Sequence, residues 1–163
     1  MTLISDLKPG DAEIVIRRTL NAPRPLVFQM FTEPRHLAQF WGPKVTQVSV
    51  CAVDLRVGGA FRVDMRDKSG ATYSCTGTYR EIVPPERIVY AATTADDNPC
   101  GGGLPPRSVV TITFAAEGGK TNLTIRAQLQ SGADREAAIA GGFSMGWNDS
   151  LDRLADLLAS SPR

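Results

Sequence analysis

The side chains able to perform covalent, metal or acid–base chemistry are few and scattered along the chain. There is one histidine, His36, and there are three cysteines, Cys51, Cys75 and Cys100. A tetrahedral zinc site built from Cys and His would have to gather all of these side chains, and no CxxC pair brings two together. Ser–His–acid catalysis would have to use His36, which lies in a helical pattern without a nucleophile motif nearby. We therefore predict no metal and no cofactor, and we assign no catalytic residue.

The remaining ionisable candidates have simple structural interpretations. Asp54 and Arg56 flank Leu55 just before a Gly-Gly turn, where they are expected to form a surface ion pair or, alternatively, a polar group at a cavity rim. Glu81 and Glu86 are interpreted as turn and surface residues. An odd number of cysteines does not indicate a disulfide framework. If Cys75 points inward, it is expected to be a small apolar filler.

Glycines and aromatic residues are concentrated near the C-terminus. Phe143 and Trp147 are one helical turn apart and lie beside Gly141, Gly142 and Gly146. Glycine inside a helix costs about 1 kcal/mol relative to alanine, so this concentration needs a reason. The glycines allow either close packing or a kink, or they leave free volume that becomes part of a ligand cavity. The sequence supports both interpretations.

Composition and charge narrow the class of partner. The chain has 163 residues, of which 42% are hydrophobic and 21% charged, and its net charge is +1. This balance is typical of one globular domain and does not favour nucleic acid or an anionic membrane surface as a partner. No apolar run is long enough to cross a bilayer, and the first residues do not resemble a secretory signal. We expect a cytoplasmic protein, either a monomer or a homodimer.

Hydrophobic periodicity predicts the elements that position these side chains. Residues 13–20 form a first strand, and two short helices follow, the first ending at Pro34 and the second running from there to Trp41. Further strands are predicted over 45–56, 60–66, 71–83, 87–94, 108–115 and 121–129. Hairpin-length connections between consecutive strands require antiparallel pairing, so the fold class is α+β.

The C-terminal segment changes to a helical period. An apolar stripe steps by three or four residues from Asp134 onward, and predicts one amphipathic helix of about 26 residues lying on the sheet. The stripe consists of Ile139, Phe143, Trp147, Leu151, Leu154 and Leu158. Residues 95–107, rich in glycine and proline, are a candidate lid at one end of the sheet or a variable connection. Residues 1–12 are predicted to be a flexible tail, and 13–160 to be the folded domain.

Several motifs in register resemble the START-like (SRPBCC, helix-grip) superfamily. They are R-x-L-x-A-P (18–23), F-W-G-P (40–43), D-L-R-V-G-G (54–59), G-x-Y-x-E-I-x-P-P-E-R-I (77–88), V-T-I-T-F (110–114) and G-W-N-D-S-L-D-R-L (146–154). More narrowly, the chain is similar to the branch named for the activator of the ninety-kilodalton heat-shock-protein ATPase. The resemblance implies a seven-stranded curved antiparallel sheet wrapped round a long C-terminal helix, with two short helices after the first strand and an apolar cavity inside.

This resemblance and the apolar face of the strands together suggest where a ligand would bind. The candidate cavity residues are Phe31, Phe40, Trp41, Phe61, Val63, Met65, Tyr73, Cys75, Tyr79, Ile112, Phe114, Leu123, Ile125, Gly142, Phe143 and Trp147. Tyr73 and Tyr79 would supply polar groups, because a buried phenol needs a hydrogen-bond partner. The leading hypothesis is binding of a small hydrophobic molecule in a lipid-binding-like cavity. The alternatives are a co-chaperone-like module that binds a protein partner and, third, an enzyme of the cyclase or hydrolase kind.

Overall fold

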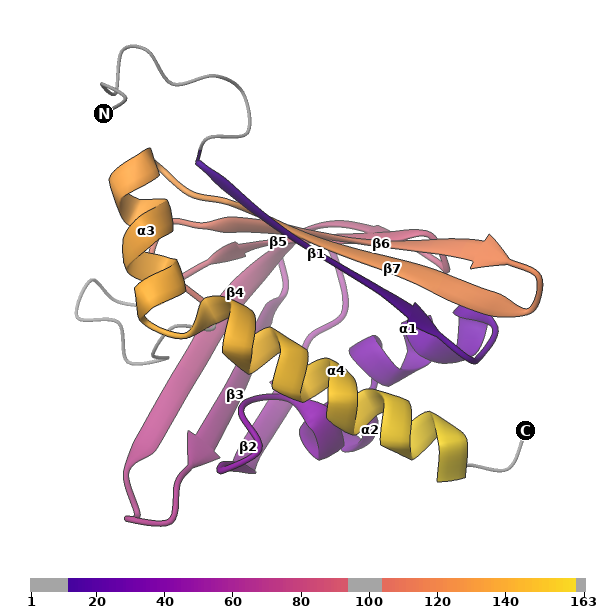
Figure 1. The fold of residues 1–163 in the computed structure, drawn as a ribbon, viewed down its shortest axis with the longest axis horizontal. Helices are drawn as coiled ribbons and strands as arrows, with labels where there is room; N and C mark the ends of the chain where they lie inside the picture. Colours follow the sequence, from indigo (N-terminus) through magenta and orange to yellow (C-terminus); the bar gives the residue numbers. More distant parts are fainter. Residues whose placement is uncertain (1–11, 94–103, 161–163) are drawn as a thin grey trace.

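A computed structural model describes residues 12–93 and 104–160, and within these ranges one seven-stranded sheet forms the framework (Figure 1). Its strand order is β1-β7-β6-β5-β4-β3-β2, and every neighbouring pair is antiparallel. The strands are β1 (Glu13–Leu20), β2 (Gln47–Val53), β3 (Ala60–Arg66), β4 (Thr72–Val83), β5 (Arg87–Ala92), β6 (Val109–Glu117) and β7 (Lys120–Gln128). The predicted α+β, helix-grip fold class is confirmed.

Alternation along the strands builds one apolar face. In β3, Phe61, Val63 and Met65 are buried, whereas Arg62 and Arg66 between and beside them are exposed. Val63 pairs with Cys75 of β4, so the buried face continues across the sheet in register. A period of two places such residues on one side of a pleated strand, which is why the apolar face could be predicted.

Two short helices follow β1 and close one end of this face. Helix α1 (Arg24–Thr32) and helix α2 (Pro34–Phe40) each have a proline in the first turn, where the missing N–H costs no hydrogen bond. Phe28 and Phe31 pack edge-on against Phe114 of β6, with ring centroids 5.2 Å and 5.5 Å apart. These contacts fix α1 against the sheet and bring the chain after α2 toward the C-terminal helix.

The C-terminal helix is broken, which corrects the prediction of one continuous helix. Helix α3 (Gly132–Ala140) ends at Gly141, and helix α4 (Phe143–Ser160) begins after Gly142. Gly142 has a φ of +95°, a left-handed conformation that glycine adopts without steric cost and that terminates a helix. Ile139 precedes this break and is 39% exposed, so its predicted place on the buried stripe was wrong. From Phe143 onward the stripe is buried as predicted.

Helix α4 lies diagonally across the sheet and runs beside α2 (Figure 1). The connection between α2 and β2 is longer than predicted, because β2 begins at Gln47 and ends at Val53. Val45, predicted to be the first residue of that strand, is 63% exposed in this connection, and Leu55, predicted to belong to the same strand, is 43% exposed in a turn. The loop of residues 41–46 is therefore free to cover the edge of the sheet beside α4.

Candidate functional site

A pocket of about 240 Å³ opens where the 41–46 loop, the sheet and the α3–α4 junction meet. The sheet contributes Met65 at the end of β3 and Tyr73 and Cys75 in β4. The other lining residues are Trp41, Gly42, Pro43, Val45, Thr46, Asp67, Gly141, Gly142, Met145, Gly146, Trp147 and Ser150. Gly141, Gly142 and Gly146 border open space, so the glycines both break the helix and leave room for the pocket.

Two tryptophans form the inner wall. Trp41 is 7% exposed and Trp147 is 4% exposed, and their rings meet edge to face with centroids 5.6 Å apart. Trp41 also packs on Phe61 at 6.1 Å. Such edge-to-face contacts hold both rings in defined orientations, so the inner end of the pocket is rigid and apolar. Val45 and Met145, which are 63% and 64% exposed, place apolar side chains at its outer end.

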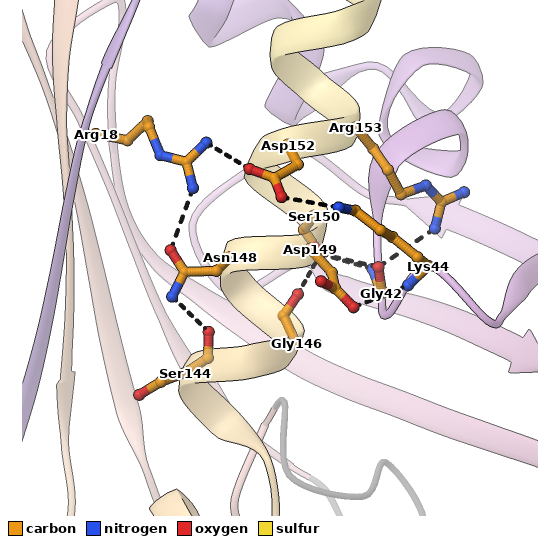
Figure 2. Close-up of polar contacts among 10 residues, drawn as sticks. All are labelled: Arg18, Gly42, Lys44, Ser144, Gly146, Asn148, Asp149, Ser150, Asp152 and Arg153. Atoms are coloured by element: carbon orange, nitrogen blue, oxygen red, sulfur yellow. Dashed lines mark hydrogen bonds and ion pairs between the residues drawn. The ribbon is translucent and has the colours of Figure 1, made fainter.

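The loop wall is fastened to α4 by hydrogen bonds (Figure 2). The Gly42 N–H donates to Ser150 Oγ at 2.8 Å, and Arg153 Nη1 lies 3.3–3.4 Å from the carbonyl oxygens of Trp41, Gly42 and Pro43. Gly42 itself has a φ of +95°, and a Cβ there would lie 2.3 Å from Met65 Sδ. A side chain at position 42 is therefore excluded both by the backbone conformation and by the pocket wall.

A charged network continues this attachment on the surface of α4. Asp152 accepts hydrogen bonds from Arg18 Nη1 and from Lys44 Nζ, both at 2.9 Å (Figure 2). The hydrogen bonds from Lys44 and from Arg18 lower the pKa of Asp152. The hydrogen bond to Asp152 in turn raises the pKa of Lys44. The Lys44 backbone N–H also donates to Asp149 Oδ2 at 3.1 Å. The loop beside the pocket is thus held at several points, although exposed pairs each contribute little.

Asp67 and Tyr73 provide the polar groups on the sheet side. The Tyr73 hydroxyl donates to Asp67 Oδ2 at 3.0 Å. Asp67 Oδ1 accepts from Ser69 Oγ at 2.6 Å, from Ser69 N at 2.9 Å and from Ala71 N at 3.1 Å. The Ser69 hydroxyl and these further donors lower the pKa of Asp67, so its carboxyl group is ionised at neutral pH. Tyr73 therefore finds the hydrogen-bond partner expected of it.

A second, inner space of about 20 Å³ lies behind Trp41. A water molecule needs about 10–15 Å³ of such volume, so this space has room for one water and not for an organic ligand. It is lined by Phe31, Leu37, Trp41, Phe61, Tyr79, Ile88, Tyr90 and Ile112. Burial raises the pKa values of both Tyr79 and Tyr90 well above the usual phenol value. The ligand-sized volume is therefore confined to the outer pocket.

The candidate cavity residues fall into three groups. Those that line the outer pocket are Trp41, Met65, Tyr73, Cys75, Gly142 and Trp147. Those that line the inner space, together with Trp41, are Phe31, Phe61, Tyr79 and Ile112. Those that line neither and are packed in the core are Phe40, Val63, Phe114, Leu123, Ile125 and Phe143. The sheet face is mostly filled, because α1 and α4 cover its middle.

Sequence reasoning missed the loop and the outer end of the pocket. The candidate list omitted Gly42, Pro43, Val45, Thr46, Asp67, Met145 and Ser150. The FWGP motif was a signal for Gly42 and Pro43, but it was read as the end of a helix. No local pattern predicts that Ser150 faces this loop, since the two segments are 108 residues apart in the chain.

The other chemical candidates lie away from the pocket or are inert. Asp54 and Arg56 form the predicted surface ion pair at 2.9 Å, and Glu81 pairs with Arg87. Cys75 is completely buried, so it points inward, and it is disulfide-bonded. Cys51 is a free thiol whose pKa is raised by burial, which disfavours the reactive thiolate. The candidate lid falls mainly on residues 94–103, outside the described ranges.

This arrangement suits binding more than proton transfer. Asp67 and Tyr73 are the ionisable side chains of the pocket besides the bonded Cys75, and neither a histidine nor a second carboxylate accompanies them among the described lining residues. In the part of the chain that the structure describes, no group of three or more His, Cys, Asp or Glu side chains could hold a metal ion. No helix in the described ranges is both long and apolar enough to cross a membrane.

An antiparallel sheet gripping a C-terminal helix, with an apolar pocket between them, defines a START-like (SRPBCC) protein. The chain belongs to the family described as "Activator of Hsp90 ATPase homolog 1-like protein", whose model matches residues 21–159. The resemblance stated from the sequence motifs is confirmed. A search of curated proteins finds no match.

Solved bacterial structures share the fold. A protein from Chromobacterium violaceum is 32% identical, with 92% of this chain and 99% of that chain covered and a TM-score of 0.75. A protein from Nitrosomonas europaea is 26% identical, covers 91% and 95% respectively, and has a TM-score of 0.81. The AHSA1 protein from Silicibacter pomeroyi is 22% identical, covers 91% and 98%, and has a TM-score of 0.71. The family and fold support, in general terms, a ligand-binding or co-chaperone-like module.

Proposed function

We propose that this protein binds a small hydrophobic molecule in the pocket between the 41–46 loop, β3–β4 and helix α4. The observation that carries the proposal is the pocket itself, about 240 Å³ with two buried tryptophans on its inner wall. Sites for drug-sized ligands are about 300–1,000 Å³, so the ligand should be small, with a body of one or two rings. An apolar wall gains from burying such a body, and the fixed Trp41 and Trp147 rings need no reordering to receive it.

Gly146 offers the sharpest test of the location. It lies on α4 and lines the pocket, and a Cβ added there would meet only Pro43 Cγ, at 3.8 Å. Gly146→Ala followed by Gly146→Leu therefore fills the pocket in two steps without a backbone conflict. Ala159→Leu is the control, because it places a leucine at an exposed position of the same helix.

The measurement is thermal unfolding with and without 2-naphthylmethanol, a neutral two-ring probe. A ligand in about hundredfold excess over its Kd stabilises the folded state by about 2.7 kcal/mol, or about 5–10 °C for a domain of this size. We expect this shift in the wild type and in Ala159→Leu, a smaller one in Gly146→Ala and none in Gly146→Leu. An undiminished shift in a folded Gly146→Leu protein would place the binding site elsewhere.

A co-chaperone-like function is the second candidate, favoured by the family to which the chain belongs. Its physical support is the pair of exposed apolar side chains at the pocket's outer end, Val45 and Met145, which could contact a protein. If a broad panel of neutral and charged one- and two-ring probes gives no thermal shift in the wild type, this candidate replaces ligand binding. Stimulation of a purified heat-shock ATPase, lost in Val45→Asp and Met145→Asp, would then be the supporting result.

A further inference from the structure

The charged side chain among the described residues that line the pocket is acidic. Asp67, ionised and half-buried in the turn between β3 and β4, is among the lining residues. Its Oδ2 accepts a hydrogen bond from the Tyr73 hydroxyl, whereas Oδ1 accepts several from the turn itself. Among the described lining residues there is no lysine, arginine or histidine to balance it. Asp67 is therefore the charged group that a ligand would meet among the described lining residues.

Lys44 on the loop and Arg153 on α4, two cations beside the pocket, are already engaged with other groups. Lys44 Nζ reaches along α4 to Asp152, at 2.9 Å, and Arg153 Nη1 points at the carbonyl oxygens of the loop (Figure 2). Asp152 is in turn shared with Arg18. These positive charges are therefore already paired with other groups of the loop and of α4.

The apolar side chains that line the pocket also favour a cation over an anion. Trp41, Tyr73 and Trp147 present aromatic rings, and Met65 and Met145 present polarizable thioethers. The face of an aromatic ring attracts a cation through its quadrupole, and tryptophan does so most strongly. A carboxylate, sulfate or phosphate on a ligand would face these rings and Asp67 without a compensating cationic side chain among the described lining residues. The wall and the rim thus favour the same sign of charge.

We propose that the pocket selects small apolar molecules that carry a positive charge, aryl- or alkylammonium ions, over neutral and anionic molecules of the same shape. The inference rests on the ligand-binding function proposed above and adds the chemical class of the ligand. The apolar body lies against Trp41 and Trp147, and the ammonium group lies on the Asp67 side. Fatty acids and other anionic amphiphiles are disfavoured.

Three probes of one shape test the charge preference: 2-naphthylmethylamine, which is protonated at neutral pH, 2-naphthylmethanol and 2-naphthoate. Calorimetric titration at about 10 mM salt, where the Debye length is about 30 Å, reveals the charge effect most fully. We expect the amine to bind about fivefold more tightly than the alcohol, because Asp67 is partly screened by solvent, and naphthoate to bind most weakly. At about 1 M salt the advantage of the amine over the alcohol should shrink, whereas the affinity for the alcohol should hold.

Asp67→Asn assigns the effect to one carboxylate. Asparagine keeps an acceptor for the turn while removing the charge, so the amine should fall to the affinity of the alcohol, which should itself be unchanged. Asp54→Asn, at an exposed carboxylate outside the pocket, is the control and should keep the preference. If Asp67→Asn does not fold, the salt dependence of the wild type still decides the question.

The outcomes separate the two proposals. If no probe binds, the ligand-binding function fails, and the charge preference fails with it. If amine, alcohol and naphthoate bind equally well at low salt, ligand binding stands and the charge preference is overturned. Tighter binding of naphthoate than of the amine would also overturn it, since it would show an unnoticed cation at the site.

Discussion

The hydroxyl oxygen of Ser150 accepts a hydrogen bond from the backbone N–H of Gly42 at 2.8 Å and lies 3.0 Å from the carbonyl oxygen of Gly146. Ser150 is buried on the inward side of α4, whereas Gly42 lies in the loop after α2 (Figure 2). This side chain therefore joins the two walls of the pocket. Its partner N–H has no access to bulk water as an alternative, which makes the bond costly to remove.

Ser150→Ala should lower the free energy of unfolding by about 1–3 kcal/mol, because the Gly42 N–H would be left buried without its acceptor. Denaturant unfolding measures this change. Ser160→Ala is the control, since that hydroxyl is exposed near the end of the same helix and bonds only to the Leu157 carbonyl oxygen. Equal, small effects of both substitutions would show that the Gly42–Ser150 bond does not fasten the loop.

Gly142 and Gly146 should respond to alanine with opposite signs. Gly146→Ala should stabilise the protein by up to about 1 kcal/mol, because the position is helical and the new Cβ makes only an ordinary contact, at 3.8 Å. Gly142→Ala should destabilise it by about 1 kcal/mol, because its φ of +95° is unfavourable for any side chain even though the nearest atom, Met145 Cε, would lie at an ordinary contact distance of 3.5 Å. Thermal unfolding of the two variants side by side checks the sign of each change.

Tyr90 is expected to tolerate loss of its hydroxyl. The Tyr90 hydroxyl is buried and has no hydrogen-bond partner within the described part of the chain. Tyr90→Phe should leave the free energy of unfolding unchanged or raise it by up to about 1 kcal/mol, because the buried group gains nothing in the folded state. Tyr73→Phe, which loses the bond to Asp67, should instead be destabilising. A clear loss of stability in Tyr90→Phe would reveal a bound water in the inner space.

Asp64 should make the free energy of unfolding depend on pH in the acid range. Arg62 Nε and Nη2 donate to its two carboxylate oxygens at 3.0 Å and 2.9 Å, and this contact lowers the pKa of Asp64. A lowered folded-state pKa gives stability that is present above the unfolded value of about 4 and is lost as the pH falls through the folded value. Asp64→Asn should therefore flatten the pH dependence of unfolding below about pH 4.

Arg62→Gln tests the cause of this acid dependence. Without the guanidinium, the folded-state pKa of Asp64 should rise toward its unfolded value, so the loss of stability on acidification should be smaller than in the wild type. Denaturant unfolding across the acid range would compare the two variants with the wild type. Identical curves for wild type and Asp64→Asn would mean that other carboxylates govern acid unfolding.

Local pattern in the sequence determined the strands, the face that each strand buries, and most of α4. The alternation of residues 60–66 predicts that Phe61, Val63 and Met65 point inward, and all three do. The apolar stripe from Phe143 to Leu158 is buried as its spacing indicates. These features follow from backbone geometry over a few residues, because the periods of a strand and a helix are fixed by the chain itself.

Only the tertiary structure decided where the pocket lies and which residues line it. The glycines near Trp147 allowed either a break in the helix or free volume, and the fold shows both at once. Phe114 and Ile125 lie on the predicted inner face, but both are packed in the core, and the ligand-sized space lies beside the 41–46 loop. Free volume remains where the side chains of facing segments do not fill the space between them. Here the facing segments are up to 108 residues apart in the chain. No pattern within one segment can specify it.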